Sequence, residues 1–189
     1  MGSIVALVQL ANYGLLDLLG SVAFTPVKND MMGNIKKIRD RQLFSPQTSS
    51  TLQSLVRSEL SQQSPKTHTA TEGLLWLTRG LDFTAQSLRH DLTANKSVAP
   101  DAPKPKQELA DSFRAGYKTT LAPHHSWMVK PIFSAAMSAT PYRKDYFRKL
   151  VDRQCNADKA MEMLEEWVAA LEERVKILND FLATKDAKW

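Results

Sequence analysis

Apolar residues recur every three or four positions along most of this chain, which is the spacing of an amphipathic α-helix. The clearest example follows Phe24-Thr25-Pro26, where Val27, Met31, Ile35 and Ile38 fall on one face. A threonine followed by a proline is typical of the cap and the first residue of a helix. The sequence therefore predicts a helix from residue 25 to about residue 42.

The same spacing predicts further helices along the chain, and several have recognisable starts. Thr69 and Glu72 form a capping-box pattern, Thr140-Pro141 repeats the cap-plus-proline start, and Asn156 is a favoured cap residue. The predicted helices span about residues 3–19, 25–42, 50–60, 69–92, 108–121, 123–137, 140–150 and 156–182. No segment of the sequence shows the two-residue alternation of a β-strand. We therefore expect an all-α fold of about eight helices packed in layers.

Length and composition indicate a single domain that covers residues 1–189. With 43% hydrophobic residues, 189 residues suffice for one core but are too few for two comfortable ones. Pro100, Pro103 and Pro105 lie in an alanine- and lysine-rich segment, so residues 94–106 are predicted to form a flexible surface loop. Cys155 is the single cysteine, which rules out an internal disulfide and fits a reducing compartment.

The apolar segment from Ile4 to Leu19 could be mistaken for a signal peptide or a membrane span. No basic residue precedes it, and Gln9, Asn12 and Asp17 interrupt it. A signal peptide needs a positive first region, and a membrane span needs an uninterrupted apolar run. We interpret the segment as a buried helix and expect a cytosolic protein.

The net charge of +5 is spread along the chain rather than gathered in one segment. Nucleic-acid binding typically requires a basic stripe with interleaved aromatic residues, so no nucleic-acid partner is expected. A mild positive charge does favour contact with an anionic membrane surface, at up to about 1 kcal/mol per well-placed Lys or Arg.

The sequence contains no catalytic or metal-binding motif that we recognise. It lacks a Gly-rich phosphate loop, a Gly-x-Ser-x-Gly elbow and a His/Cys set at metal-ligand spacing. His124 and His125 are adjacent, so they cannot chelate a metal as an i, i+4 helical pair would. We therefore expect no enzymatic activity, no metal and no cofactor.

Two groups of polar and aromatic residues suggest ligand binding. Asp30, Asn34 and Lys37 share one face of the helix that starts near Pro26, beside its apolar stripe. They could bind a hydroxyl-rich ligand with an apolar tail, but an ordinary polar ladder on an amphipathic helix has the same pattern. Trp76 would normally be a core residue, although an indole at a polar helix edge can also stack against the C–H face of a sugar.

Three separated motifs resemble those of the glycolipid transfer protein family. The motifs are Asp30-x-x-x-Asn34-x-x-Lys37 after Phe24-Thr25-Pro26, then Leu75-Trp76-Leu77-Thr78-Arg79-Gly80-Leu81-x-Phe83, and then His125-Ser126-Trp127. Ile132-Phe133-x-Ala135-Ala136 and Ala139-Thr140-Pro141-Tyr142 extend the resemblance. It covers the chain from residue 17 to its end and is closest to fungal heterokaryon-incompatibility members, whereas residues 4–16 depart from the family pattern.

The resemblance implies a two-layer all-α sandwich that holds one sphingolipid and makes or breaks no bond. It implies that Asp30 contacts the ceramide amide and the sugar, and that Asn34 and Lys37 hydrogen-bond the sugar. It also implies that Trp76 stacks against the sugar and that His125 contacts the amide carbonyl. The expected ligand resembles glucosylceramide or galactosylceramide, carried by a monomer that touches membranes transiently.

The hydrocarbon pocket and the membrane-contact surface are assigned less directly. By the same resemblance, the pocket should be lined by Phe24, Val27, Phe83, Leu121, Phe133 and Met137, a set that sequence alone cannot distinguish from an ordinary core. Membrane contact is expected from Trp127, with Lys130, Arg143 and Lys144 nearby. Core packing is the alternative for Trp127.

Two other functions compete with glycolipid transfer. Ceramide-1-phosphate carriers resemble this fold but have cationic residues where Asn34 and Trp76 stand, so the sequence favours a sugar over a phosphate. A glycolipid sensor that reports to a partner protein, for example in non-self recognition, is the alternative from a different class.

Overall fold

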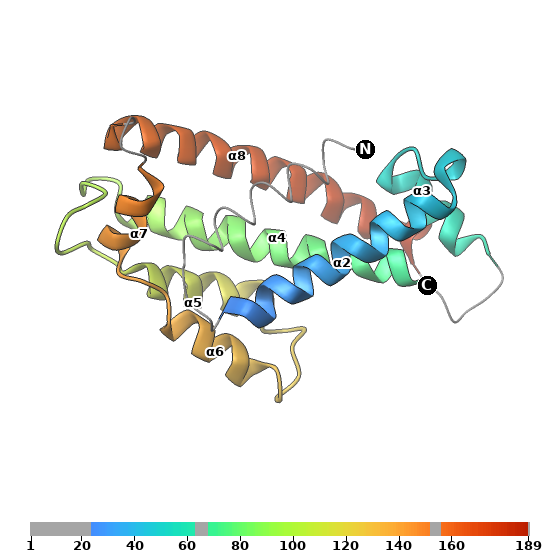
Figure 1. Cartoon of the computed structure of the whole chain (residues 1–189), viewed down its shortest axis with the longest axis horizontal. Helices are drawn as coiled ribbons and strands as arrows, with labels where there is room; N and C mark the ends of the chain where they lie inside the picture. Colours follow the sequence, from blue (N-terminus) through green and yellow to red (C-terminus); the bar gives the residue numbers. More distant parts are fainter. Residues whose placement is uncertain (1–23, 63–67, 152–155, 189) are drawn as a thin grey trace.

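Helices form most of the described part of the chain, which comprises residues 24–62, 68–151 and 156–188 of the computed structural model (Figure 1). These residues contain no strand, so the predicted all-α class is confirmed. The helix expected over residues 3–19 and Cys155 lie outside the described residues. The α-helices are α2 (Thr25–Phe44), α3 (Leu52–Leu60), α4 (Thr69–Ala94), α5 (Leu109–Thr119), α6 (Lys130–Ser138), α7 (Arg143–Leu150) and α8 (Ala157–Leu182), and the 3₁₀ helices are η2 (Pro46–Thr48) and η3 (Lys185–Ala187).

The start of α2 lies where the sequence predicts it, but the capping residue differs. Phe24 occupies the cap position and makes no side-chain hydrogen bond to the helix, and Thr25 is already helical. At α8 the prediction is confirmed, because the Asn156 side chain accepts a hydrogen bond of 2.7 Å from the Lys159 backbone amide. This bond satisfies one of the amides that a helix start leaves without an intrahelical partner.

The capping box predicted at the start of α4 does not form. Thr69 is the first helical residue, and the free amides of Ala70 and Thr71 donate instead to the carboxylate of Glu59 on α3, at 3.1 and 2.7 Å. The Thr71 hydroxyl donates to the same carboxylate at 2.6 Å. A buried side chain from another helix therefore supplies the acceptor that local sequence was expected to provide.

The helix expected from Pro123 begins seven residues later, at Lys130. Residues 120–125 form turns in which the amides of His124 and His125 both donate to the Leu121 carbonyl. Pro131 sits in the first turn of α6, where its missing amide costs no hydrogen bond. The shift matters for function, because it places His125 on a turn rather than on a helix.

Helix α4 lies at the centre of the fold and packs against α2, α3, α5 and α8. Figure 1 shows α8, α4 and α5 side by side, with α2 crossing in front of α4. Gly73 permits this crossing, because a Cβ atom at that position would lie only 3.2 Å from the Asn34 carbonyl oxygen and from the Lys37 Cβ. At the next interface a Cβ on Gly116 of α5 would overlap with Ser87 of α4.

The apolar core consists of two clusters of buried side chains. One gathers residues of α2, α3, α4 and the end of α8, including Met31, Ile35 and Leu55. The other includes Val27 and Phe83 and extends through α5, α6, α7 and the first half of α8. Because Val27 and Met31 are one turn apart on α2, the two clusters meet where α2 crosses α4.

A buried ion pair connects α4 to α7. The Arg143 Nε atom lies 3.0 Å from Asp91 Oδ2, and both side chains are 1% exposed. The Arg143 Nη1 atom also donates to the carbonyl oxygens of Ala99 and Pro100, at 3.3 and 3.1 Å. This pair and its carbonyl contacts tie the long connection between α4 and α5 to the core.

Residues 95–108 connect α4 to α5, and Ala94, which the sequence assigns to a flexible surface loop over residues 94–106, is the last residue of α4. The buried side chain of Asn95 closes this connection, accepting from the Lys106 amide at 2.9 Å and donating to the Gln107 carbonyl at 3.0 Å. The flexibility of the connection stays a prediction for the exposed segment between these contacts. Among the described residues, no helix is both long and apolar enough to span a membrane.

Candidate functional site

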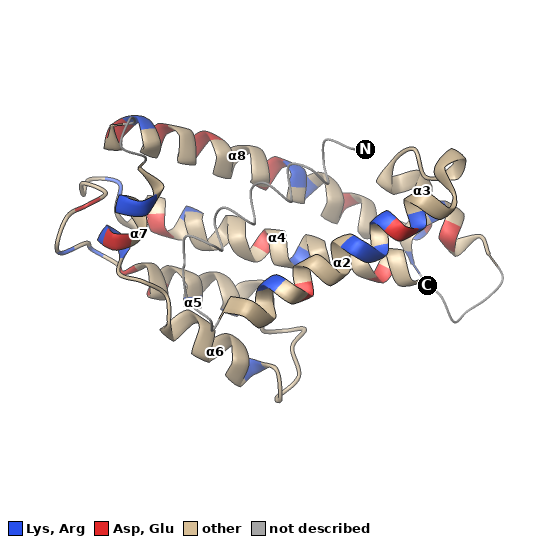
Figure 2. Cartoon of the chain, viewed as in Figure 1, with Lys and Arg blue, Asp and Glu red and all other residues tan. Residues whose placement is uncertain are grey.

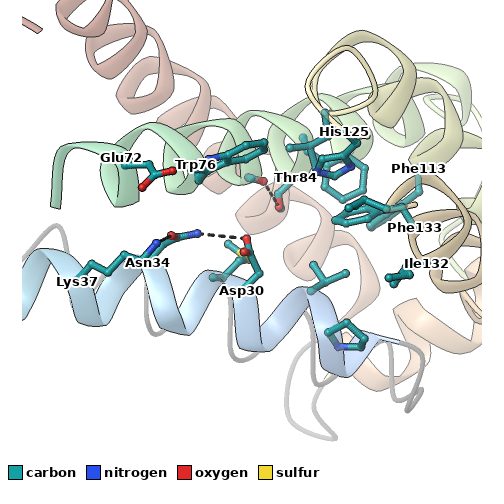
Figure 3. A pocket seen from close by; sticks show the side chains of 17 residues that line it. Asp30, Asn34, Lys37, Glu72, Trp76, Thr84, Phe113, His125, Ile132 and Phe133 are labelled. Atoms are coloured by element: carbon teal, nitrogen blue, oxygen red, sulfur yellow. Dashed lines mark hydrogen bonds between the residues drawn. The ribbon is translucent and has the colours of Figure 1, made fainter. Parts of the chain in front are cut away.

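A cavity of about 370 Å³ opens where α2 crosses α4 (Figure 3). Its volume falls in the range of about 300–1,000 Å³ that is usual for small-molecule sites. One end carries the polar side chains of α2 together with Trp76, and the other end is lined by aromatic and aliphatic residues. The lining comprises Pro26, Val27, Asp30, Met31, Asn34, Lys37, Glu72, Trp76, Gly80, Phe83, Thr84, Phe113, Leu121, His125, Val129, Ile132 and Phe133.

The polar end is built from three consecutive turns of α2. Asn34 is buried and donates from Nδ2 to Asp30 Oδ2 at 3.2 Å, and its Oδ1 accepts from Lys37 Nζ at 3.4 Å. These contacts order the carboxylate, the amide and the ammonium in a row along the cavity wall. This geometry is the polar ladder that an ordinary amphipathic helix would also show. Here, however, the ladder faces a cavity large enough for a small ligand.

The electrostatics of this row leave the Asp30 carboxyl able to accept hydrogen bonds. Partial burial raises the pKa of Asp30 above its ordinary value, and the neighbouring Lys37 ammonium opposes that shift. Asp30 itself remains exposed on the cavity side. A carboxylate with free lone pairs and an adjacent ammonium can accept from and donate to the hydroxyls of one ligand.

Aromatic rings from two distant segments meet on the opposite wall. The Trp76 indole of α4 stacks on the His125 imidazole with ring centroids 5.9 Å apart and an interplanar angle of 20°. The Arg79 guanidinium lies 4.8 Å from the Trp76 ring centroid. The indole is half-buried, so part of its surface remains available to a ligand.

His125 is held by the aromatic cluster beneath it. Its Nδ1 lies 3.1 Å from the Tyr117 hydroxyl, and its ring centroid is 4.5 Å from that of Phe133. Burial lowers the pKa of His125, and the positive charges of His124, Lys130 and Arg79 lower it further. The neutral imidazole is therefore favoured, and Nε2 is left for a ligand because Nδ1 contacts the Tyr117 hydroxyl.

The apolar end receives most of the residues predicted for a hydrocarbon pocket. Val27, Phe83, Leu121 and Phe133 line the cavity. Phe24 and Met137 are buried in the same core cluster but lie outside the lining. The rings here pack edge to face, with the Phe83 centroid 5.6 Å from that of Phe113 and 6.3 Å from that of Phe133.

The residues predicted to touch a membrane do not share one surface. Trp127 is 80% exposed beside Met128 at 62%, and Ile132 is 45% exposed. Lys130, also exposed, is the single charged residue of α6 (Figure 2). The exposure of Trp127 excludes the alternative that this residue packs in the core.

The assignment of Arg143 to membrane contact is wrong. Arg143 is 1% exposed, because its charge pairs with Asp91 inside the protein. Lys144 is half-buried on α7, which follows the last residue of α6, whereas the Trp127 segment precedes its first residue (Figure 1). Of the four residues, only Trp127 and Lys130 lie in one exposed segment.

Several lining residues were not assigned a role from the sequence. Glu72 precedes Trp76 by one helical turn, so its position on the same face could have been found from the spacing. Tyr117, which lies behind the lining and contacts His125, gave no such indication, because that contact depends on the turns that separate α5 from α6. Among the described residues, no cluster of His, Cys, Asp or Glu is arranged to hold a metal ion.

Comparison with known proteins shows that the sequence and the fold of this chain are similar to those of glycolipid transfer proteins. The family model described as Glycolipid transfer protein (GLTP) matches residues 8–152. A glycolipid transfer protein of Aureobasidium melanogenum is 58% identical over 175 residues, covering 93% of this chain and 79% of that protein. The crystal structure of HET-C2, a fungal glycolipid transfer protein, matches with a TM-score of 0.81 at 51% identity, covering 93% of this chain and 81% of that one. A structure of FAPP2, which selects simple glycosphingolipids using the same fold, matches with a TM-score of 0.75 at 30% identity, covering 93% and 82% of the two chains.

Proposed function

The chain belongs to the glycolipid transfer protein family, and on this basis we propose that it binds one glycosphingolipid and carries it between membranes. The observation that carries the proposal is the composition of the cavity. A row of hydrogen-bonding groups and an indole lie at one end, and aromatic and aliphatic side chains line the other. A sugar joined to two hydrocarbon chains has the same division between a polar and an apolar part.

In this proposal the polar end recognises the headgroup. The Trp76 indole stacks against the C–H face of the sugar, and the α2 row of Asp30, Asn34 and Lys37 hydrogen-bonds its hydroxyls. His125 donates from Nε2 to the ceramide amide carbonyl, because the Tyr117 hydroxyl already occupies Nδ1. Each hydrogen bond contributes about 1 kcal/mol net, so several must act together to select a headgroup.

The apolar end provides the hydrocarbon with a surrounding equivalent to the bilayer interior. A lipid leaves the membrane only if its chains remain shielded from water, because exposing each CH₂ group to water costs about 0.8 kcal/mol. The rings of Phe83, Phe113 and Phe133 supply that surface in the described part of the cavity. Asn34 and Trp76, rather than cationic residues, face the headgroup, which favours a sugar over the phosphate of ceramide-1-phosphate.

Membrane docking is proposed for the segment around Trp127. Its exposed indole, the Met128 side chain and the Lys130 ammonium suit the interface between lipid tails and headgroups. The segment also begins directly after His125, so docking there would bring the cavity close to the bilayer. We further propose that the protein acts as a monomer in the cytosol and touches membranes transiently.

Replacing Trp127 with alanine is expected to weaken binding to anionic vesicles by about tenfold, because one large aromatic side chain no longer enters the interface. Co-sedimentation with phosphatidylserine-containing vesicles measures the effect. Phe44→Ala is a matched control, since Phe44 is 79% exposed but lies at the far end of α2. Equal losses for the two variants would contradict docking through the Trp127 segment.

The function itself is tested by transfer between vesicles. Purified protein is expected to accelerate the movement of fluorescent glucosylceramide from donor to acceptor vesicles, while a ceramide-1-phosphate probe moves far more slowly. Binding of glucosylceramide without transfer, together with a co-purifying protein, would instead support a glycolipid sensor. Absence of both binding and transfer would contradict the proposal.

A further inference from the structure

Glu72 is an acidic residue of the cavity lining that the proposed headgroup contacts do not use. It lies one turn before Trp76 on α4, so the two side chains share a helix face. Figure 3 shows Glu72 and Trp76 facing Asn34 and Lys37 across the space between α4 and α2. Glu72 is exposed, and its carboxylate makes no hydrogen bond or ion pair within the part of the chain that the structure describes.

The close helix crossing brings Glu72 to the headgroup end of the cavity. Its neighbour Gly73 approaches α2 so closely that a Cβ there would lie 3.2 Å from the Lys37 Cβ and Cδ. Glu72 therefore stands opposite the last member of the α2 row. A favourable interaction with the α4 dipole explains an acidic residue in the first turn of the helix, but it does not require one that faces the cavity.

The cavity lining carries more acidic than basic side chains. Asp30 and Glu72 contribute two carboxylates, whereas Lys37 contributes one ammonium. For His125, the remaining ionisable lining residue, burial and nearby cations lower the pKa and so favour the uncharged imidazole. Arg79 lies against the Trp76 ring and outside the lining. A headgroup in this end of the cavity therefore meets more negative than positive charge from the lining.

Building on the proposed function, we propose that Glu72 is a specificity-determining residue that selects uncharged sugar headgroups. Its carboxylate accepts hydrogen bonds from hydroxyls of a neutral hexose, beyond the reach of the α2 row. The same carboxylate repels a headgroup that carries a sulfate or a phosphate on the sugar. Discrimination of this kind combines an attractive contact to one ligand with a repulsive contact to its competitor.

The test compares two lipids that differ by a single sulfate. Fluorescent galactosylceramide and 3-sulfogalactosylceramide with the same acyl chain are transferred between phosphatidylcholine vesicles by the wild type and by Glu72→Gln. The substitution keeps the side-chain volume and a hydrogen-bond acceptor but removes the charge. We expect transfer of the sulfated lipid, relative to the neutral one, to rise about three- to fivefold, as for an exposed charge interaction.

Asp40→Asn is the matched control, because it makes the same change in net charge on an exposed position of α2 outside the cavity lining. It is expected to leave the ratio of the two transfer rates unchanged. The Glu72→Gln effect should also shrink as salt is raised, since charge interactions are screened over about 10 Å at 0.1 M.

The outcomes separate the role of Glu72 from the proposed function. If Glu72→Gln transfers galactosylceramide but keeps the wild-type ratio, or if Asp40→Asn changes the ratio equally, the assignment of Glu72 is overturned. If the wild type transfers neither lipid, the proposed function fails together with the specificity built on it. Unfolding curves of both variants show whether a changed rate reflects a loss of folded protein.

Discussion

Replacing Trp76 with alanine is expected to lower the rate of glycosphingolipid transfer by about tenfold or more. In the proposed site the indole forms the wall against which the sugar stacks, so its removal takes away an aromatic contact and the apolar area beneath it. The substitution also leaves His125 without its stacking partner at 5.9 Å. Asp30→Val is expected to have a comparable effect, because it removes the carboxylate that we propose contacts both the sugar and the ceramide amide.

Transfer of fluorescent glucosylceramide between vesicles measures the Trp76→Ala effect, and circular dichroism checks that the variant remains helical. Leu75→Ala is the matched control, since Leu75 is half-buried at the neighbouring position of α4 but outside the cavity lining. Trp76→Phe should retain part of the activity because a smaller ring still offers a flat surface. Full activity in both Trp76→Ala and Asp30→Val would refute the proposed headgroup site.

Replacing Arg143 with methionine is expected to destabilise the protein by about 3–5 kcal/mol, because the change leaves the Asp91 carboxylate buried without its partner. Asp91 is 1% exposed, and burial raises its pKa while Arg143 opposes that shift. Without Arg143 the folded protein should favour the protonated carboxyl more strongly than the unfolded chain does. The folded state would then bind more protons, so the defect should diminish as the pH is lowered from 7 towards 5.

Urea denaturation at pH 7 and pH 5 measures both parts of this prediction. The double variant Asp91→Leu/Arg143→Met should recover most of the lost free energy of unfolding, since a buried ion pair replaced by apolar residues often costs little. Arg148→Met on the exposed face of α7 is the control, because its ion pair with Asp145 is open to solvent and should contribute less than about 1 kcal/mol. Equal stability of Arg143→Met and Arg148→Met would show that the buried pair contributes nothing specific.

The helical architecture could be predicted because its determinants are local. Helical spacing and the Thr25-Pro26 start located α2, and a single side-chain cap located the start of α8. At α4 the sequence located the start of the helix but not its cap, and at α6 it did not locate the start. Glu59 from α3 replaces the expected cap of α4, and turns anchored on Leu121 delay α6 until Lys130.

The candidate site was predictable in composition but only partly in geometry. Asp30, Asn34 and Lys37 are related by helix spacing, so their common face followed from the sequence, whereas the stacking of His125 on Trp76 required the structure. Arg143 was misassigned because arginine is mostly exposed, and its partner lies 52 residues away in the sequence.

The limits of the proposed hydrocarbon pocket were also beyond sequence reasoning. A cavity lining and a closed core use the same side chains, so the sequence could not tell which predicted residues face the empty space. The structure places Phe83 and Phe133 in the lining and leaves Phe24 and Met137 in the packed cluster behind it.

Native mass spectrometry of the protein offered an equimolar mixture of glucosylceramide and ceramide-1-phosphate tests the central claim most directly. The account predicts a complex with one glucosylceramide molecule per monomer, which the Trp76→Ala variant forms far less readily. Exclusive binding of ceramide-1-phosphate, or glucosylceramide binding that is unchanged in the variant, would contradict a sugar-selective site built on α2 and Trp76.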